Sequence, residues 1–156
     1  MQDANTKLAE SLKAVDKLKT ENIVEIKSLK TPSKTALIVL GGCVIMFEDI
    51  IKARGREIIM RKVEGTIKKE EDWMNTARIE LLDNPKQFLE QLKGYDKEHI
   101  NQALVAKFNQ KIRSEPDFNF EKAKSAGVCI EALYQWEMAM YSFNQIYINT
   151  QPLREK

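Results

Sequence analysis

The sequence is poor in the residues that most often form metal centres and catalytic nucleophiles. Among its 156 residues it has one histidine, His99, and two cysteines, Cys43 and Cys129. No other potential metal ligand stands near His99 at a spacing typical of metal sites, so we expect this histidine to face solvent or lie near a helix cap. The cysteines lie far apart in apolar surroundings, without a histidine beside them. We therefore expect reduced core thiols and no metal site.

Motifs for binding nucleotides are also absent. No P-loop pattern G-x-x-x-x-G-K-[ST] occurs, and no glycine-rich turn stands between a strand and a helix. Without a nucleotide site, a metal site or a nucleophile, the sequence predicts no catalytic residue, no cofactor and no enzyme activity for this chain.

Long apolar runs are missing as well. The longest one, ALIVLGGCVIMF at 36–47, is shorter than the roughly 18 to 20 residues that a membrane span needs. The first residues, MQDANTKLAESLKAVDKLK, lack the apolar middle of a signal peptide. We expect no membrane partner, a cytosolic location, and a buried core helix at 36–47.

Charge is balanced overall, with a net charge of +2, but it is unevenly distributed. Two stretches carry more basic than acidic residues, one near the amino terminus and one in the last third. They contain Lys17, Lys19, Lys27, Lys30 and Lys34, and then Lys107, Lys111, Arg113, Lys122 and Lys124. Such stretches fit either an acidic partner or ordinary solvated helix faces.

The most regular pattern lies near the carboxyl terminus. Apolar residues recur there at alternating spacings of three and four, which predicts a helix with one narrow packing face. This face is formed by Ala126, Cys129, Leu133, Trp136, Met140, Phe143, Tyr147 and Thr150. Because the aromatic residues follow the heptad spacing, we expect them to pack against a helix rather than stack on bases, and we expect no nucleic-acid partner.

The only other narrow face belongs to the first thirty residues. Leu8, Leu12 and Val15 begin it, and its phase lapses at Lys19 and Asn22. A change of phase indicates a helix that exchanges one partner for another, or one whose pairing slides. Since the two patterned helices flank the middle of the chain, they can lie together only antiparallel.

The middle of the chain contains a segment of a different kind. More than half of the residues at 48–72 are charged, and Gly55 and Gly65 interrupt any helix there. Two interpretations remain open, an exposed loop or a functional flap, and the segments around Val63–Gly65 fit a short β-hairpin. The predicted fold is all-α: a small helical bundle, or head, on a stem of two antiparallel coiled-coil helices, with a charged insertion at about 48–72.

The order of the segments resembles one family, the microtubule-binding heads of dynein heavy chains with the adjoining stalk. The similar segments are ENIVEIKSLKTPS, ALIVLGGCVIMF, DWMNTARIELLDNPKQFLEQLKGYDKEHI, EPDFNFEKAK, QWEMAMYSF and QPLREK. They extend over essentially the whole chain. The long link at 48–72 and the segment LLDNPKQFLEQLKGYDKEHI are similar to axonemal dyneins, so a cilium or flagellum is the expected location within the cytoskeleton.

The resemblance implies three parts and a mechanism. Residues 1–20 correspond to the outgoing stalk helix, 21–135 to the microtubule-binding head and 136–156 to the returning stalk helix. In the family the ATPase ring lies at the far end of the stalk, and sliding of the stalk helices switches the affinity of the head. The residues expected to set this register are Leu8, Leu12, Val15, Trp136, Met140, Phe143 and Tyr147.

The resemblance also implies the residues that contact tubulin, because the family uses its first, third and last head helices. The corresponding residues are Lys19, Lys27, Lys30, Arg78, Glu121, Lys122 and Lys124. Ser125 is a departure, since cytoplasmic members have an arginine there. Lys124 could replace that arginine, or binding could be weaker or differently tuned.

Partners follow from the same resemblance: the microtubule, made of α- and β-tubulin, and the rest of a dynein heavy chain through the stalk. The alternative is a non-motor helical adaptor, or coiled-coil interaction module, whose outer helices pair between chains. A monomer favours the first interpretation, and we expect the isolated chain to be monomeric.

Overall fold

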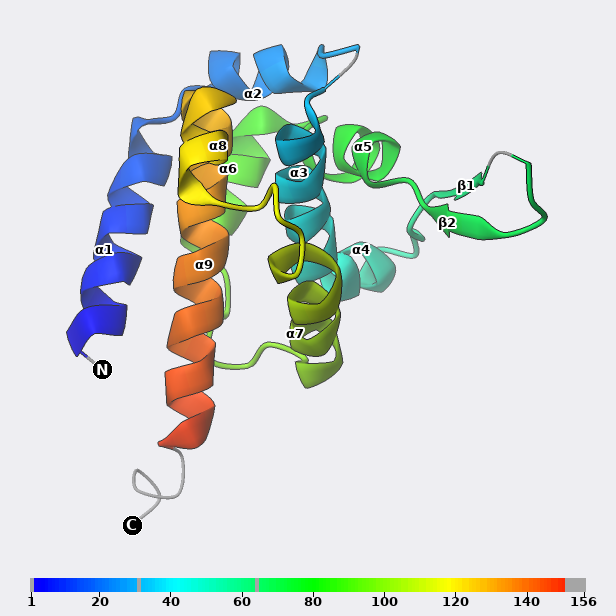
Figure 1. Ribbon diagram of the computed structural model, residues 1–156. Helices are drawn as coiled ribbons and strands as arrows, with labels where there is room; N and C mark the ends of the chain where they lie inside the picture. The colour runs from blue at the N-terminus through cyan, green and yellow to red at the C-terminus, as the bar shows by residue number, and fades with distance from the viewer. Residues whose placement is uncertain (1, 31, 64, 151–156) are drawn as a thin grey trace.

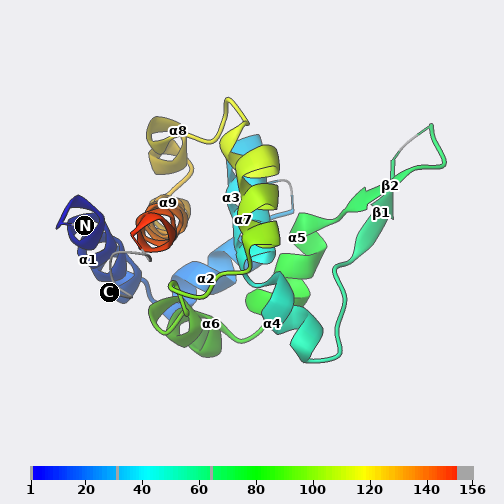
Figure 2. The same cartoon turned by 90° about the horizontal axis from the view of Figure 1, so that it is seen from below.

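The two outermost helices of the chain lie side by side and antiparallel. The computed structural model describes residues 2–30, 32–63 and 65–150. Helix α1 (Gln2–Lys17) packs along α9 (Val128–Asn149), and the two run in opposite directions (Figure 1). The view from below shows the same pair beside the rest of the bundle (Figure 2). The predicted antiparallel pairing within one chain is confirmed.

The phase lapse near Lys19 is a break between two helices. Helix α2 (Thr20–Lys27) begins after a turn and crosses the end of the bundle (Figure 1). The side-chain oxygen of Asn22 accepts a hydrogen bond from the Lys19 backbone N–H at 2.9 Å, which starts the new helix. Helix α2 packs against α6 (Pro85–Lys93) and α9, and α1 packs against the same two helices, so the break changes the direction of the chain rather than its helical partners.

Helix α3 (Lys34–Met46) runs through the centre of the head, as its apolar sequence predicted. All residues from Ile38 to Met46 are buried, and Ser33 caps the helix by accepting a hydrogen bond from the Ala36 N–H. The two glycines of α3 allow close contacts on two sides. A Cβ at Gly41 would lie 2.3 Å from the Trp73 ring, and one at Gly42 would lie 2.3 Å from Glu137 Oε1.

The charged segment contains a helix and a hairpin. Helix α4 (Glu48–Ala53) buries Glu48 and Ile51, so the first turns of the segment at 48–72 pack on the head, and the predicted border at residue 48 stays a prediction. Strands β1 (Met60–Lys62) and β2 (Lys69–Glu71) then pair antiparallel, with Arg61 opposite Glu70, and the predicted hairpin is confirmed. The hairpin projects sideways from the bundle (Figures 1 and 2).

Short helices complete the head around α3. They are α5 (Trp73–Thr76), the π-helical segment η1 (Ala77–Leu81), α6, α7 (Gln102–Phe108), the π-helical segment η2 (Asn109–Arg113) and α8 (Phe120–Ser125). Among the described residues, no helix is long and apolar enough to cross a membrane.

The carboxyl-terminal region forms two helices, α8 and α9, and Ala126, the first residue of the predicted heptad face, lies between them. Helix α8 ends at Ser125, and Gly127 adopts φ of 122° before α9 begins. Residues with a side chain rarely adopt this backbone conformation, so the glycine separates the two helices. Helix α9 then continues without a break past residue 135, where the sequence placed the border between head and returning stalk, and that border stays a prediction.

Candidate functional site

Helices α2 and α8 lie at one end of the molecule, and each packs against α9 (Figure 1). The start of α1 and the end of α9 lie at the opposite end. Most of the basic residues selected from the sequence belong to α2, to the segment after it, or to α8. The structure therefore brings two of the predicted contact segments to a common end.

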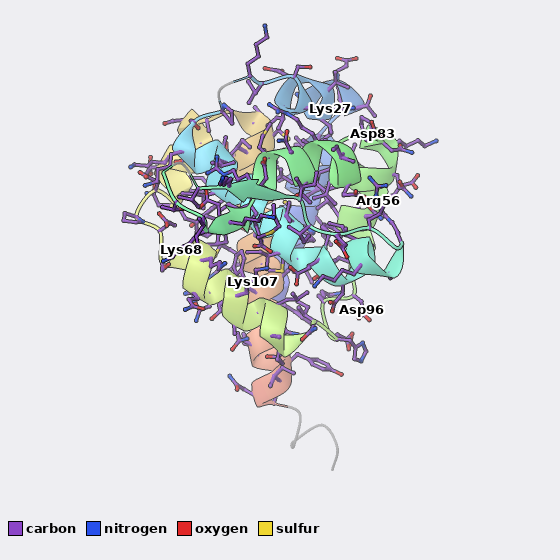
Figure 3. All side chains as sticks on the ribbon, turned by 90° about the vertical axis from the view of Figure 1, so that its right-hand side faces the viewer. Lys27, Arg56, Lys68, Asp83, Asp96 and Lys107 are labelled. Carbon is purple, nitrogen blue, oxygen red and sulfur yellow. The ribbon has the colours of Figure 1, made fainter. Side chains whose placement is uncertain are left out.

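Lys27, in the last turn of α2, is half-exposed and already has an anionic partner. Its Nζ lies 2.9 Å from Oδ1 of Asp83, in the segment before α6. Figure 3 shows this pair at the α2 end, whereas Arg56 and Lys107 lie farther toward the end of α9. Asp83 was not selected from the sequence, because it pairs with Lys27 only through the packing of α2 on α6.

The Arg78 side chain in η1 forms hydrogen bonds within the protein. Its Nε donates a hydrogen bond to the carbonyl of Lys27 at 3.2 Å, and another guanidinium nitrogen donates to the carbonyl of Leu29. These carbonyls lie at and just beyond the end of α2, where a helix leaves its last acceptors without partners. Arg78 thus holds the end of α2. Its predicted contact with tubulin stays a prediction.

Helix α8 presents both acidic and basic side chains. Asn119 caps it by accepting a hydrogen bond from the Lys122 backbone N–H at 2.9 Å, and Glu121 is exposed in its first turn. Lys122 forms an ion pair with Asp117, and Lys34 lies 3.3 Å from the same carboxylate. Lys122 and Lys34 lower the pKa of Asp117.

The remaining predicted contacts are exposed and form no ion pair with another described residue. These are Lys19, Lys30 and Lys124. Ser125, at the end of α8, is exposed as well. The common end therefore has both free and internally paired cations.

The residues predicted to set the register differ in their surroundings. Val15, Trp136, Met140 and Phe143 are buried, while Leu8, Leu12 and Tyr147 are partly buried. The aromatic rings on α9 lie beside the segment that follows α6. The ring centroids of Tyr95 and Trp136 are 5.1 Å apart, and those of His99 and Tyr147 are 6.3 Å apart. The Lys97 amine lies 5.2 Å from the centroid of the Phe143 ring. Their pairing with α1 stays a prediction.

A neighbouring face of α9 adjoins α1. A cleft between the two helices is lined by Glu10, Lys13, Ala14 and Lys17 on α1, and by Val128, Glu131, Ala132 and Gln135 on α9. Small residues such as Ala14 and Ala132 allow the two helices to approach closely. The sequence singled out the aromatic face of α9 because its residues recur at the heptad spacing.

A cluster of charged residues joins the hairpin to the head, and sequence reasoning missed it. The Lys107 amine lies 2.7 Å from Glu48 Oε1 and 2.5 Å from Glu71 Oε1. Trp73 Nε1 donates a hydrogen bond to the second oxygen of Glu71 at 3.3 Å. Because the lysine comes from α7 and the carboxylates from α4 and β2, this cluster fixes the base of the hairpin.

His99 and the two cysteines occupy the environments that the sequence predicted. His99 is exposed, with its Nδ1 3.0 Å from Asp96 Oδ1. Cys43 and Cys129 are buried and free, and burial raises the pKa of Cys129 to about 12. Within the part of the chain that the structure describes, no group of histidine, cysteine and acidic residues could hold a metal ion.

Comparison with known proteins decides the family. The family described as "Microtubule-binding stalk of dynein motor" matches residues 1–156. The chain belongs to this family. The microtubule-binding domain of dynein-c has the same fold, with a TM-score of 0.73 and 24% identity over 99% of this chain and 94% of that one.

Related dynein heavy chains include axonemal and cytoplasmic members. Dynein axonemal heavy chain 3 of Mus musculus is 28% identical over 99% of this chain, and human dynein axonemal heavy chain 17 is 25% identical over 97%. A cytoplasmic dynein heavy chain of Caenorhabditis elegans is 23% identical over 96%. The chain spans only 3 to 4% of the length of these dyneins.

Proposed function

We propose that this chain is the part of a dynein heavy chain that contacts the microtubule, through the end formed by α2, η1 and α8. The family match over the whole chain carries the proposal. The gathering of basic residues at the end opposite the start of α1 and the end of α9 supports it. Helices α1 and α9 are then the distal stalk, which links the head to the rest of the heavy chain.

The charges at this end determine how such a surface works. Tubulin carboxylates would compete with Asp83 for Lys27, and with Asp117 for Lys122 and Lys34. Lys19, Lys30 and Lys124 have no such competitor among the described residues. Each exposed pair contributes about 1 kcal/mol or less, so several weak pairs act together.

Microtubule binding should therefore depend strongly on salt. In co-sedimentation with microtubules, we expect affinity to fall at least several-fold between about 50 and 200 mM salt, because exposed charges are screened over about 10 Å in this range. Binding that does not change with salt would contradict a surface made of lysines. Absence of pelleting at every salt concentration would contradict the proposed function itself.

The adaptor alternative predicts a different oligomeric state. In an adaptor, the outer helices would pair between chains, whereas here α1 and α9 already pair within one chain. Light scattering should give a mass near 18.0 kDa that does not change with concentration. A dimer that forms through α1 and α9 would favour the adaptor.

We further propose that the register of α1 on α9 sets the affinity of the head. The break between α1 and α2 supports this, because it separates α1, whose main partner is α9, from α2, which packs on both α6 and α9 at the end of the head. Pairs of cysteines that lock α1 at different positions along α9 should give different microtubule affinities in co-sedimentation. Equal affinity in every locked form, with each disulfide verified by mass spectrometry, would refute the role of register.

We also propose that this chain belongs to an axonemal dynein heavy chain rather than a cytoplasmic one. Its support is the hairpin between α4 and α5 together with the axonemal relatives, although cytoplasmic relatives match as well. The location that follows is the axoneme of a cilium or flagellum. The projecting hairpin is then a functional flap. Unchanged binding after its deletion would instead favour an exposed loop without function.

A further inference from the structure

Glu137 on α9 is a carboxyl group that lies wholly inside the head. Its exposed fraction is 0%, and no lysine, arginine or histidine forms an ion pair with it among the described residues. The Cys43 thiol donates a hydrogen bond to Oε2 at 3.1 Å. Oε1 is the buried side-chain oxygen that finds no hydrogen-bond partner in the described part of the chain. Such an atom calls for a physical explanation, because buried polar groups are nearly always paired.

The carboxyl occupies a recess on α3 that exists because residue 42 is glycine. A Cβ at Gly42 would lie 2.3 Å from Oε1 and 2.7 Å from the carboxyl carbon, much closer than atoms can approach. The backbone of α3 thus forms one wall of the recess. The carboxyl fits only while α9 keeps its present position along α3.

The surroundings of Glu137 disfavour a negative charge. The titratable groups that interact with it are Cys43 on α3 and Tyr134 on its own helix. Cys129 and Tyr95 interact with Cys43, and Glu25 of α2 interacts with Cys129. Arg113 of η2 interacts with Tyr134, but neither Cys43 nor Tyr134, the groups that interact with Glu137 directly, is a cation. An isolated carboxylate in such a site is far less stable than the neutral acid.

We propose that Glu137 holds α9 in position against α3 as an uncharged carboxylic acid, and that a movement of α9 which exposes this side chain to water releases a proton. The inference that this proton release regulates microtubule affinity rests on the proposed function, in which α9 continues into the stalk. The proton linkage itself depends only on the geometry of the head.

The direction of the pH effect follows from the same burial. Burial raises the pKa of Glu137 well above its usual range, and the hydrogen bond from Cys43 acts in the opposite direction without cancelling it. The unfolded-state pKa of a glutamate is about 4.3. Because the pKa of Glu137 is higher in the folded state, its protonation stabilises the folded chain. This contribution to folding stability is fully present below about pH 4.3 and is lost as pH rises through the folded pKa.

The direct test is infrared spectroscopy of the folded chain at pH 7. We expect the band of a protonated carboxylic acid, and we expect Glu137→Gln to lack it. Glu131→Gln is the matched control, because Glu131 lies on the same helix but is partly exposed. The control should keep the band. A wild-type spectrum without this band would overturn the proposal.

Urea unfolding across pH provides a second test that does not depend on band assignment. Relative to Glu137→Gln, the unfolding equilibrium constant of the wild type should rise by up to about tenfold per pH unit between the unfolded and folded pKa values. A constant difference between wild type and Glu137→Gln would contradict the proton linkage. If Glu137→Gln does not fold, Gly42→Ala, whose methyl group displaces the carboxyl, should remove the infrared band instead.

Microtubule co-sedimentation at pH 6 and pH 8 tests the functional part. The ratio of the two affinities should differ between wild type and Glu137→Gln by at least about threefold, since one linked proton allows up to tenfold per pH unit. Glu131→Gln should behave as wild type, and the titration of tubulin is common to all three. Equal ratios with an intact infrared band would overturn the regulatory part. Absence of binding by every variant at low salt would instead contradict the proposed function.

Discussion

Replacing Trp136 with alanine is expected to destabilise the head by about 3 to 5 kcal/mol, the usual range for a large buried aromatic residue. Trp136 has an exposed fraction of 0%. Its ring stacks on Phe47 with centroids 5.7 Å apart and 4° between the planes, and it meets Tyr95 edge to face. Its Nε1 donates a hydrogen bond to the Leu92 carbonyl at 2.9 Å. The substitution removes all of these contacts and leaves a cavity.

Urea denaturation followed by circular dichroism would measure this loss, which is a large part of the 5 to 15 kcal/mol typical of a whole domain. Trp136→Phe is the matched control. It keeps a ring against Phe47 but leaves the Leu92 carbonyl without its donor, so we expect a smaller loss of about 1 to 3 kcal/mol. A loss below about 1 kcal/mol for Trp136→Ala would show that this cluster does not join α9 to the head.

Reversing two charges on α8 is expected to have the largest effect on microtubule binding. If Lys122 and Lys124 both face tubulin carboxylates, changing both to glutamate replaces attraction with repulsion at two positions. An exposed pair contributes up to about 1 kcal/mol, so the double reversal should weaken binding by about 2 to 3 kcal/mol, which is roughly 30- to 150-fold. Co-sedimentation at low salt would measure the change.

The double variant should still fold. Residue 122 is exposed, the cap from Asn119 uses only its backbone N–H, and the ion pair with Asp117 that the substitution removes lies on the surface. Lys7→Glu, on an exposed position of α1 outside the cleft with α9, is the matched control for each single reversal, because it changes the net charge equally. An equal loss of binding in the control would indicate an effect of net charge rather than a contact surface on α8.

Local patterns in the sequence predicted the helices that have a regular hydrophobic period or clear capping and helix-breaking residues at their ends. The heptad spacing of α9 and the apolar run of α3 are properties of consecutive residues, so both elements could be found without knowing their partners. The interruption of the last helix was missed, although Gly127 stands in the sequence. A glycine shows that a break is allowed, whereas the conformation of its neighbours decides whether one occurs.

The candidate site was predictable in part. The lysines of α2 and α8 were found because basic residues cluster in the sequence and because the segments resemble a known family. Their internal partners could not be found in this way. Asp83 pairs with Lys27 across more than fifty residues, and Arg78 reaches the end of α2 from η1. Such pairs depend on how α2 lies on the rest of the head.

The sequence by itself determined that this protein is a helical head between two long helices, because periodicity and composition act over short stretches of chain. Only the tertiary structure decided which charges remain free and which are paired. The hydrogen bond from Cys43 to Glu137 joins residues far apart in the chain, and the recess that receives this carboxyl exists only where α9 crosses Gly42. Burial, and with it the protonation state of Glu137, is a property of that crossing rather than of either segment.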